Sequence, residues 1–180
     1  MSWKKLVPLA AAALVLALLP ALWLLRPAET PQIEWPSAPG HAAEPYGRSL
    51  VVYFSHTGGT ESVARRIAEL TGANTFELIP EGRYPNSALI YLTAKWQLAR
   101  RRYPALSGPL PNLTGYDTVF LGSPVWWFTA SPPLLSYLAA AEGATILPGA
   151  SFEKVGQAGG DSAALDERIR TWLAETVQRL

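Results

Sequence analysis

Apolar and polar residues along the chain predict one long apolar segment, followed by strands and helices in alternation. The apolar run at 6–25 contains twenty residues without a charge, whereas the later apolar runs are short or spaced at helical intervals. Short β-branched and aromatic runs predict strands at 49–54, 75–79, 118–122 and 145–148. Apolar residues three and four positions apart predict helices at 61–70, 86–102, 134–141 and 163–180. This alternation favours an α/β fold with an open, three-layer, mostly parallel sheet.

Residues typical of helix ends support two of these helices. Gly72 follows the apolar stripe of 61–70, as glycine often does just past the last turn of a helix. Ser131 and Pro132 suit the N-cap and the first position of the helix predicted at 134–141. The segment between the third strand and this helix, 123–133, is predicted to be a loop.

The segment 6–25 has the length that a helix needs to cross the hydrocarbon core of a bilayer. Lys4 and Lys5 precede it, so residues 1–5 are expected to stay in the cytoplasm. The rest of the chain would then face the periplasmic side of a bacterial-type inner membrane. A cleaved signal peptide is the alternative, although its apolar core is normally shorter. Residues 26–48 contain five prolines and predict a semi-extended linker before one domain at 49–180.

The amino-acid composition excludes several classes of function. The chain has no cysteine, which excludes disulfides, thiolate metal sites and cysteine nucleophiles. Its net charge of +1 does not predict a nucleic-acid-binding face. The two histidines, His41 and His56, are too few to build a multi-histidine metal site. The candidate chemistry therefore lies in the loops of the predicted sheet, with no predicted catalytic or metal-ligating residues.

The first candidate loop joins the strand 49–54 to the helix 61–70. It consists of Ser55, His56, Thr57, Gly58, Gly59 and Thr60. A helix N-terminus offers unpaired N–H groups and partial positive charge, glycine permits close approach, and the hydroxyls add donors. The loop lacks the patterns of a Walker loop and of a dinucleotide fingerprint, so it suits a single phosphomonoester. The alternative is an ordinary turn with a serine or threonine cap.

The second candidate loop follows the strand 118–122. It contains Ser123, Pro124, Val125, Trp126, Trp127 and Phe128. Three large aromatic side chains in such a loop cannot all face one core, so at least one should be exposed or should cover a planar ring. The alternative is a loop that plugs the end of the sheet. Because the first and third strands should flank the point where the winding direction reverses, both loops are expected to line one cleft. A phosphate site beside a site for a flat heterocycle predicts flavin mononucleotide (FMN).

These two stretches also resemble a known family. The sequence VVYFSHTGGTESVARRIAE is similar to the phosphate loop of flavodoxins, and YDTVFLGSPVWWFTASPP is similar to the second flavin loop of one flavodoxin-like subfamily. The resemblance covers about 49–141. It implies that Ser55 and 57–60 bind the flavin phosphate, that His56 contributes mainly backbone, and that 124–128 line the isoalloxazine and ribityl groups.

The family has five strands in the order 2-1-3-4-5, whereas this chain predicts four strand–helix units. The fourth unit is expected to be missing, which gives the order 2-1-3-5 or leaves a sheet edge for a partner such as a second copy. The resemblance implies an FMN protein that transfers electrons to or from a redox partner protein or a quinone, and the apolar segment 6–25 predicts that this protein is anchored in the membrane. An FMN-dependent NAD(P)H or quinone oxidoreductase and a binding module without flavin are the alternatives.

Overall fold

The computed structural model describes residues 45–141 and 162–177. The predicted anchor at 6–25, nearly all of the linker and the predicted strand at 145–148 lie outside these residues. Among the residues described, there is no helix with the length and apolarity required to cross a bilayer. The membrane anchor therefore stays a prediction.

A three-stranded parallel sheet forms the centre of the domain. Its strands are β1 (Ser49–Tyr53), β2 (Asn74–Glu77) and β3 (Thr118–Gly122), in the order β2-β1-β3. Val51 of β1 lies opposite Thr75 on one side and Phe120 on the other. The first three positions of the predicted strand order are thus confirmed, whereas the place of the fourth predicted strand lies outside the described residues. The edge of β3 that faces away from β1 pairs with no other described strand.

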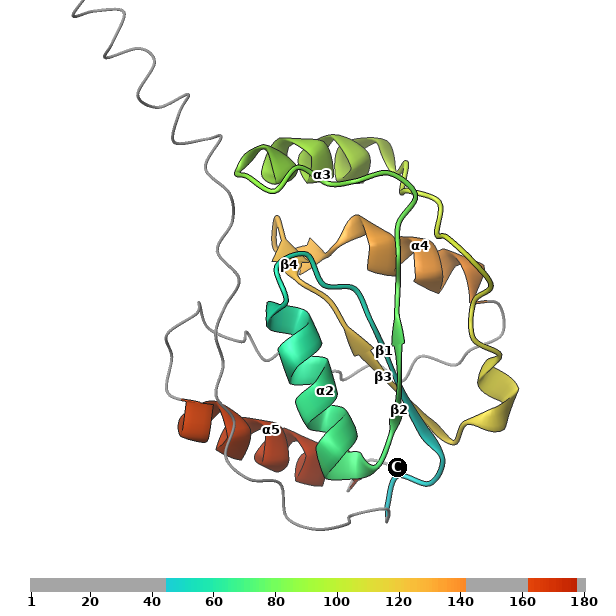
Figure 1. Cartoon of the computed structure of the whole chain (residues 1–180), viewed down its shortest axis with the longest axis vertical. Helices are drawn as coiled ribbons and strands as arrows, with labels where there is room; N and C mark the ends of the chain where they lie inside the picture. The colour runs from blue at the N-terminus through green and yellow to red at the C-terminus, as the bar shows by residue number, and fades with distance from the viewer. Residues whose placement is uncertain (1–44, 142–161, 178–180) are drawn as a thin grey trace, which may run out of the picture.

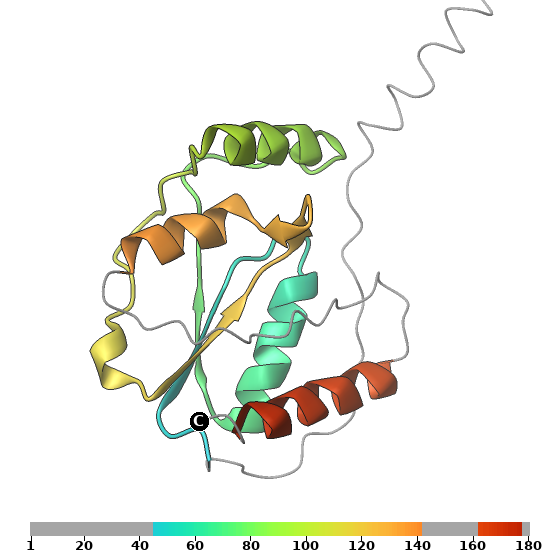
Figure 2. The same cartoon turned by 180° about the vertical axis from the view of Figure 1, so that it is seen from behind.

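Helices cover both faces of this sheet, as Figures 1 and 2 show. On one face lie α2 (Gly59–Thr71) and α5 (Ser162–Val177), and on the other lies α4 (Pro132–Ala140). The helix α3 (Leu89–Arg100) lies beyond the carboxyl ends of the strands in both views, and a 3₁₀ turn, η1 (Leu113–Gly115), precedes β3. This arrangement confirms the predicted three-layer α/β architecture.

The alternation of side chains along β1 divides the core into two clusters. Leu50 and Val52 pack with Leu134 of α4 and Ile90 of α3, whereas Val51 packs with residues of α2 and α5. All five residues of β1 are buried, which is why the sequence of this strand is an almost continuous apolar run.

Glycine and proline mark the helix ends as predicted. Gly72 adopts the left-handed conformation at the C-terminus of α2, and Pro132 stands in the first turn of α4 after the N-cap Ser131. The helix α4 begins at Pro132, which confirms the predicted first helical residue, and ends at Ala140. The helix α3 begins at Leu89 and not at 86.

The segment predicted as one loop, 123–133, contains a small antiparallel hairpin, which is a correction to the prediction. Its strands are β4 (Val125–Trp126) and β5 (Thr129–Ala130). The two residues of the tip, Trp127 and Phe128, have φ angles of 53° and 62°. The type I′ turn of a two-residue hairpin requires this left-handed backbone at both positions and usually contains Asn-Gly. The aromatic residues at the tip therefore did not predict a turn.

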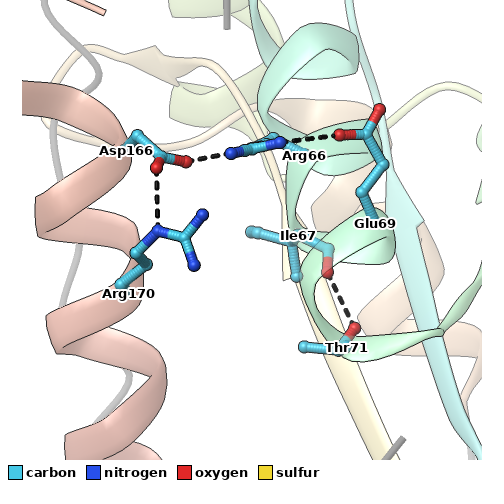
Figure 3. Close-up of polar contacts among 6 residues, drawn as sticks. All are labelled: Arg66, Ile67, Glu69, Thr71, Asp166 and Arg170. Carbon is cyan, nitrogen blue, oxygen red and sulfur yellow. Dashed lines mark hydrogen bonds and ion pairs between the residues drawn. The ribbon is translucent and has the colours of Figure 1, made fainter. Parts of the chain in front are cut away.

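A buried ion network joins α2 to α5 (Figure 3). Arg66 of α2 is only 1% exposed, and its Nε donates to Oδ1 of Asp166 at 2.6 Å. The other carboxylate oxygen of Asp166 accepts from Nε of Arg170 at 2.8 Å, and Nη1 of Arg66 donates to Glu69 at 2.9 Å. Burial opposes the charge on Asp166, but the hydrogen bonds from Arg66 and Arg170 outweigh it and lower the pKa of that carboxyl.

Candidate cofactor site at the carboxyl end of the sheet

The first candidate loop forms a corner between β1 and α2. Gly58 has a φ angle of 86°, and its N–H donates to Oγ of Ser55 at 3.1 Å. The helix starts at Gly59, and no side chain caps its N-terminus. The serine hydroxyl thus folds the loop, which fits the alternative of a turn held by a serine as well as the predicted anion site. A helix N-terminus without a side-chain acceptor can bind an anion through its N–H groups.

His56 connects the corner to the second loop. Its ring meets the ring of Trp126 edge to face, with centroids 6.1 Å apart. The Nε2 atom is buried and has no hydrogen-bond partner. Burial lowers the pKa of His56, and a hydrogen bond to the Pro85 backbone acts in the opposite direction without cancelling it. His56 is therefore held as the neutral imidazole between the two loops.

This burial predicts a pH dependence of stability. The folded-state pKa of His56 lies below its ordinary value of 6.5, so the unfolded chain binds more protons between these two values. The free energy of unfolding should therefore fall as the pH drops below 6.5 toward the folded-state pKa. Urea unfolding from about pH 7.5 to about pH 5 should show this loss in the natural chain and not in His56→Phe. His41→Phe is the matched control, and superimposable pH profiles for His56→Phe and the natural chain would contradict the assignment.

Trp126 closes the end of the sheet. It is 5% exposed, and its ring packs edge-on against Phe54 and Tyr84, with centroid distances of 5.7 and 5.3 Å. This packing matches the alternative in which the second loop plugs the sheet. The expectation that Trp126 stacks on a flavin stays a prediction.

The tip of the hairpin, in contrast, faces outward. Phe128 is 99% exposed, and Trp127 and Val125 are also exposed. The prediction that the three aromatic residues cannot share one core is confirmed. Trp127 is fixed against α3, because its Nε1 donates to the carbonyl of Tyr91 at 2.7 Å and Nζ of Lys95 lies 4.8 Å from its ring centre.

Two serines hold the base of the hairpin. Oγ of Ser123 accepts from the backbone N–H of Ser131 at 2.9 Å, and the two hydroxyls lie 2.8 Å apart. Ser131 is fully buried. The hydroxyl of Ser123 also reaches the carbonyl of Pro124 at 2.9 Å. Ser123 and Pro124 therefore position the hairpin, and the side chains available to a planar ligand come from its tip.

The chain was compared with known proteins. A family model described as Flavodoxin matches residues 48–168. The chain belongs to the flavodoxin family. This confirms the resemblance, seen in the two loop sequences, to a flavodoxin-like, FMN-binding family.

Several solved structures are similar to this chain. A protein described as a flavoprotein from Bacteroides uniformis is 29% identical, with a TM-score of 0.48 over 53% of this chain and 64% of that chain. One from Bacteroides eggerthii is 26% identical, with a TM-score of 0.48 over 52% and 62%. A flavoprotein from Lactobacillus acidophilus, solved in complex with FMN, is 24% identical, with a TM-score of 0.48 over 52% and 65%. The chain thus spans less than two thirds of the length of these proteins. No curated protein matches it.

The structure brings two residues to the site, Gly122 and Tyr84, that were not among the predicted site residues. A Cβ atom on Gly122 would lie 2.9 Å from Cβ of Tyr53 and 3.4 Å from Cγ2 of Thr60, so the end of β3 approaches the corner as closely as glycine allows. Tyr84 packs on Trp126 and donates to Oε1 of Gln97 at 2.8 Å, and burial raises its pKa to about 12. A glycine at the end of a central strand can indicate a close backbone approach, so Gly122 could have been predicted. Nothing in the sequence around Tyr84 indicated that it lies at the site.

Two surface hollows in the described part of the chain lie away from the candidate site. One has a volume of about 490 Å³ and is lined by 47–49, Gly72, Asn74, Gly115 and Tyr116. The other has a volume of about 510 Å³ and is lined by 103–106, Gly108, Leu110 and three residues of α4. Neither contains a residue of the two loops. The assignment of the site therefore depends on the chemistry and convergence of the loops and not on the volume of a cavity.

Proposed function

We propose that this chain binds FMN between the corner 55–60 and the hairpin tip and works as a membrane-anchored electron carrier. The observation that carries the proposal is the contact between His56 and Trp126, which places the two loops side by side at the carboxyl ends of β1 and β3. Membership of the flavodoxin family supports the same site.

The residues of the corner fit a phosphate group. Gly58 in its left-handed conformation lets the backbone approach a ligand, and the first turn of α2 points its N–H groups out of the corner. The hydroxyls of Ser55, Thr57 and Thr60 would supply further donors. At the other end, Trp127 and Phe128 present aromatic surface for a flat ring. Bound FMN would supply the electron-transfer chemistry, and the chain would orient it and exclude water from one side.

The location and the partners belong to the same proposal. The apolar segment 6–25 would anchor the chain in a bacterial-type inner membrane, with the domain on the periplasmic side. The electrons would pass to or from a redox partner protein or a quinone. The edge of β3 that pairs with no other described strand would be the contact for a second copy if the chain forms a homo-oligomer.

The phosphate contact can be tested by comparing FMN with riboflavin, which lacks the phosphate. Titration of the full chain in detergent should quench FMN fluorescence at lower protein concentration than riboflavin fluorescence. Thr57→Val should weaken FMN binding about tenfold or more, because a hydrogen bond to a charged group is lost, and should leave riboflavin binding unchanged. Thr75→Val, at an exposed position of β2, is the matched control.

The outcomes separate the alternatives. Unquenched FMN in the presence of the folded chain would refute the flavin site and favour a binding module without flavin. If FMN binds and the chain rapidly oxidises NAD(P)H with a quinone in the steady state, the proposed function changes from electron carrier to FMN-dependent oxidoreductase.

A further inference from the structure

The solvent face of α3 is unusually apolar for a surface helix, which normally presents charged and polar side chains to water. Tyr91, Leu92 and Trp96 are exposed there, with Leu92 at 60%. Lys95 and Arg100 lie on the same side of the helix, and Arg101 and Arg102 follow its last residue. We call this surface, made of Tyr91, Leu92, Lys95, Trp96 and Arg100, the α3 face.

The cations of the α3 face lie against aromatic rings. Cζ of Arg100 is 5.1 Å from the ring centre of Trp96, and Nζ of Lys95 is 4.8 Å from that of Trp127 at the hairpin tip. No acidic residue occurs between Leu89 and Arg102. The face therefore combines positive charge with aromatic surface and has no neighbouring carboxylate on its own helix.

We propose that the α3 face docks on the surface of an anionic lipid bilayer. Tryptophan and tyrosine prefer the boundary between headgroups and acyl chains, and lysine and arginine attract anionic headgroups. The charge complementarity favours this partner over an uncharged surface. An acidic protein would be the competing partner, and the experiment below distinguishes the two.

The sequence before the domain supports a bilayer as the partner, and here the inference rests on the proposed membrane anchor. A chain tethered by 6–25 meets the bilayer in an intramolecular step, which raises the effective concentration of the surface. The α3 helix lies beyond the carboxyl ends of the strands, whereas β1 enters from the opposite end of the sheet (Figures 1 and 2). Residues 26–44, which precede the described part of the domain, can extend to roughly 60 Å, several times the roughly 17 Å length of a five-residue strand, so this length of chain allows α3 to turn toward the membrane.

The absence of cysteine makes a direct test practical, because a single introduced cysteine carries the only label. Leu92→Cys, labelled with an environment-sensitive fluorophore, reports on the α3 face, and Glu167→Cys, exposed on α5, is the matched control. The full chain is reconstituted into vesicles of phosphatidylcholine alone or with about a third phosphatidylglycerol. We expect the label at 92 to brighten severalfold and shift to the blue only in the anionic vesicles, and the label at 167 to stay unchanged.

The charge dependence gives a second readout. Adding Lys95→Gln and Arg100→Gln to the chain labelled at 92 should weaken docking about fivefold for each charge removed, and raised salt should act in the same direction. An unchanged label at 92 in anionic vesicles, with the chain folded by circular dichroism, would overturn the proposal. A response to a soluble acidic polypeptide but not to vesicles would also overturn it and assign the face to an acidic protein.

The proposed membrane anchor is tested by a separate measurement. Flotation of the full chain with pure phosphatidylcholine vesicles reports insertion of 6–25, independently of the label at 92. Loss of flotation would refute the anchor, and the label in anionic vesicles would still decide whether the α3 face docks.

Discussion

Replacing Asp166 with alanine is expected to lower the free energy of unfolding by about 3–5 kcal/mol, because the change leaves Arg66 buried without its main anionic partner. The Arg66 side chain is 1% exposed and lies 2.6 Å from the carboxylate that would be removed. Glu69 also contacts Arg66, but its side chain is about half exposed, so solvent weakens that pair. Urea denaturation followed by circular dichroism measures the loss.

Two variants make this prediction specific. Glu69→Ala should cost less than about 1 kcal/mol, because an exposed ion pair contributes little. The double change Arg66→Met with Asp166→Leu should recover most of the stability, since an apolar pair of similar size removes both buried charges. A loss below about 1 kcal/mol for Asp166→Ala would show that the network does not hold α5 to α2.

Acid provides an independent check on the same network. Because the folded-state pKa of Asp166 lies below its ordinary value of 3.8, its contribution to stability is fully present above 3.8 and is lost as the pH falls through the folded-state value. The stability difference between the natural chain and Asp166→Asn should therefore shrink in this acidic range. A difference that stays constant there would mean that folding does not lower the pKa of Asp166.

Trp126→Ala is expected to lower the free energy of unfolding by about 3–5 kcal/mol, because it removes a large buried ring and leaves a cavity among Phe54, Tyr84 and His56. The same change should loosen the contact between the two candidate loops and weaken FMN binding. Urea unfolding and an FMN titration of the same preparation measure both effects.

The hairpin itself offers the control for this prediction. Phe128→Ala, at a fully exposed position two residues away, should change stability by no more than about 0.5 kcal/mol. Trp126→Phe should retain most of the packing. If flavin affinity is the same in Trp126→Phe and in Trp126→Ala as in the natural chain, Trp126 does not contact the cofactor, and the tip residues remain as the candidates for covering the ring.

The central strands and the corner were predictable from sequence because local rules govern them. A strand buried on both faces needs a continuous apolar run, which made β1 predictable, and the short apolar run of β3 was found in the same way although only Phe120 in it is buried. Gly58 and Gly72 bracket α2 because both positions require a left-handed backbone. The corner 55–60 was identified for the same reason, since its glycines and hydroxyls follow directly from a strand end.

Features that depend on contacts distant in sequence were not predictable. Arg66 and Asp166 are 100 positions apart, and in sequence each looks like a charge on the polar side of its helix. The burial of Trp126, compared with the exposure of Phe128, depends on a hairpin whose tip lacks the usual turn residues. The packed side of α3 was not predictable either: Leu92 and Trp96 are spaced like a packed apolar stripe but face water, and the structure buries Ile90 and Ala94 instead. Which side of the helix packs depends on where the helix lies against the sheet.

The hairpin tip has a consequence for protein engineering. Trp127 and Phe128 hold a backbone conformation that costs non-glycine residues about 1–3 kcal/mol each, and Asn-Gly would occupy it without that penalty. If thermal stability alone were selected, both aromatic residues of the tip would be replaced. A stabilised variant with Asn-Gly at the tip would therefore be a scaffold in which the rest of the fold is kept while the aromatic surface beside the corner is removed.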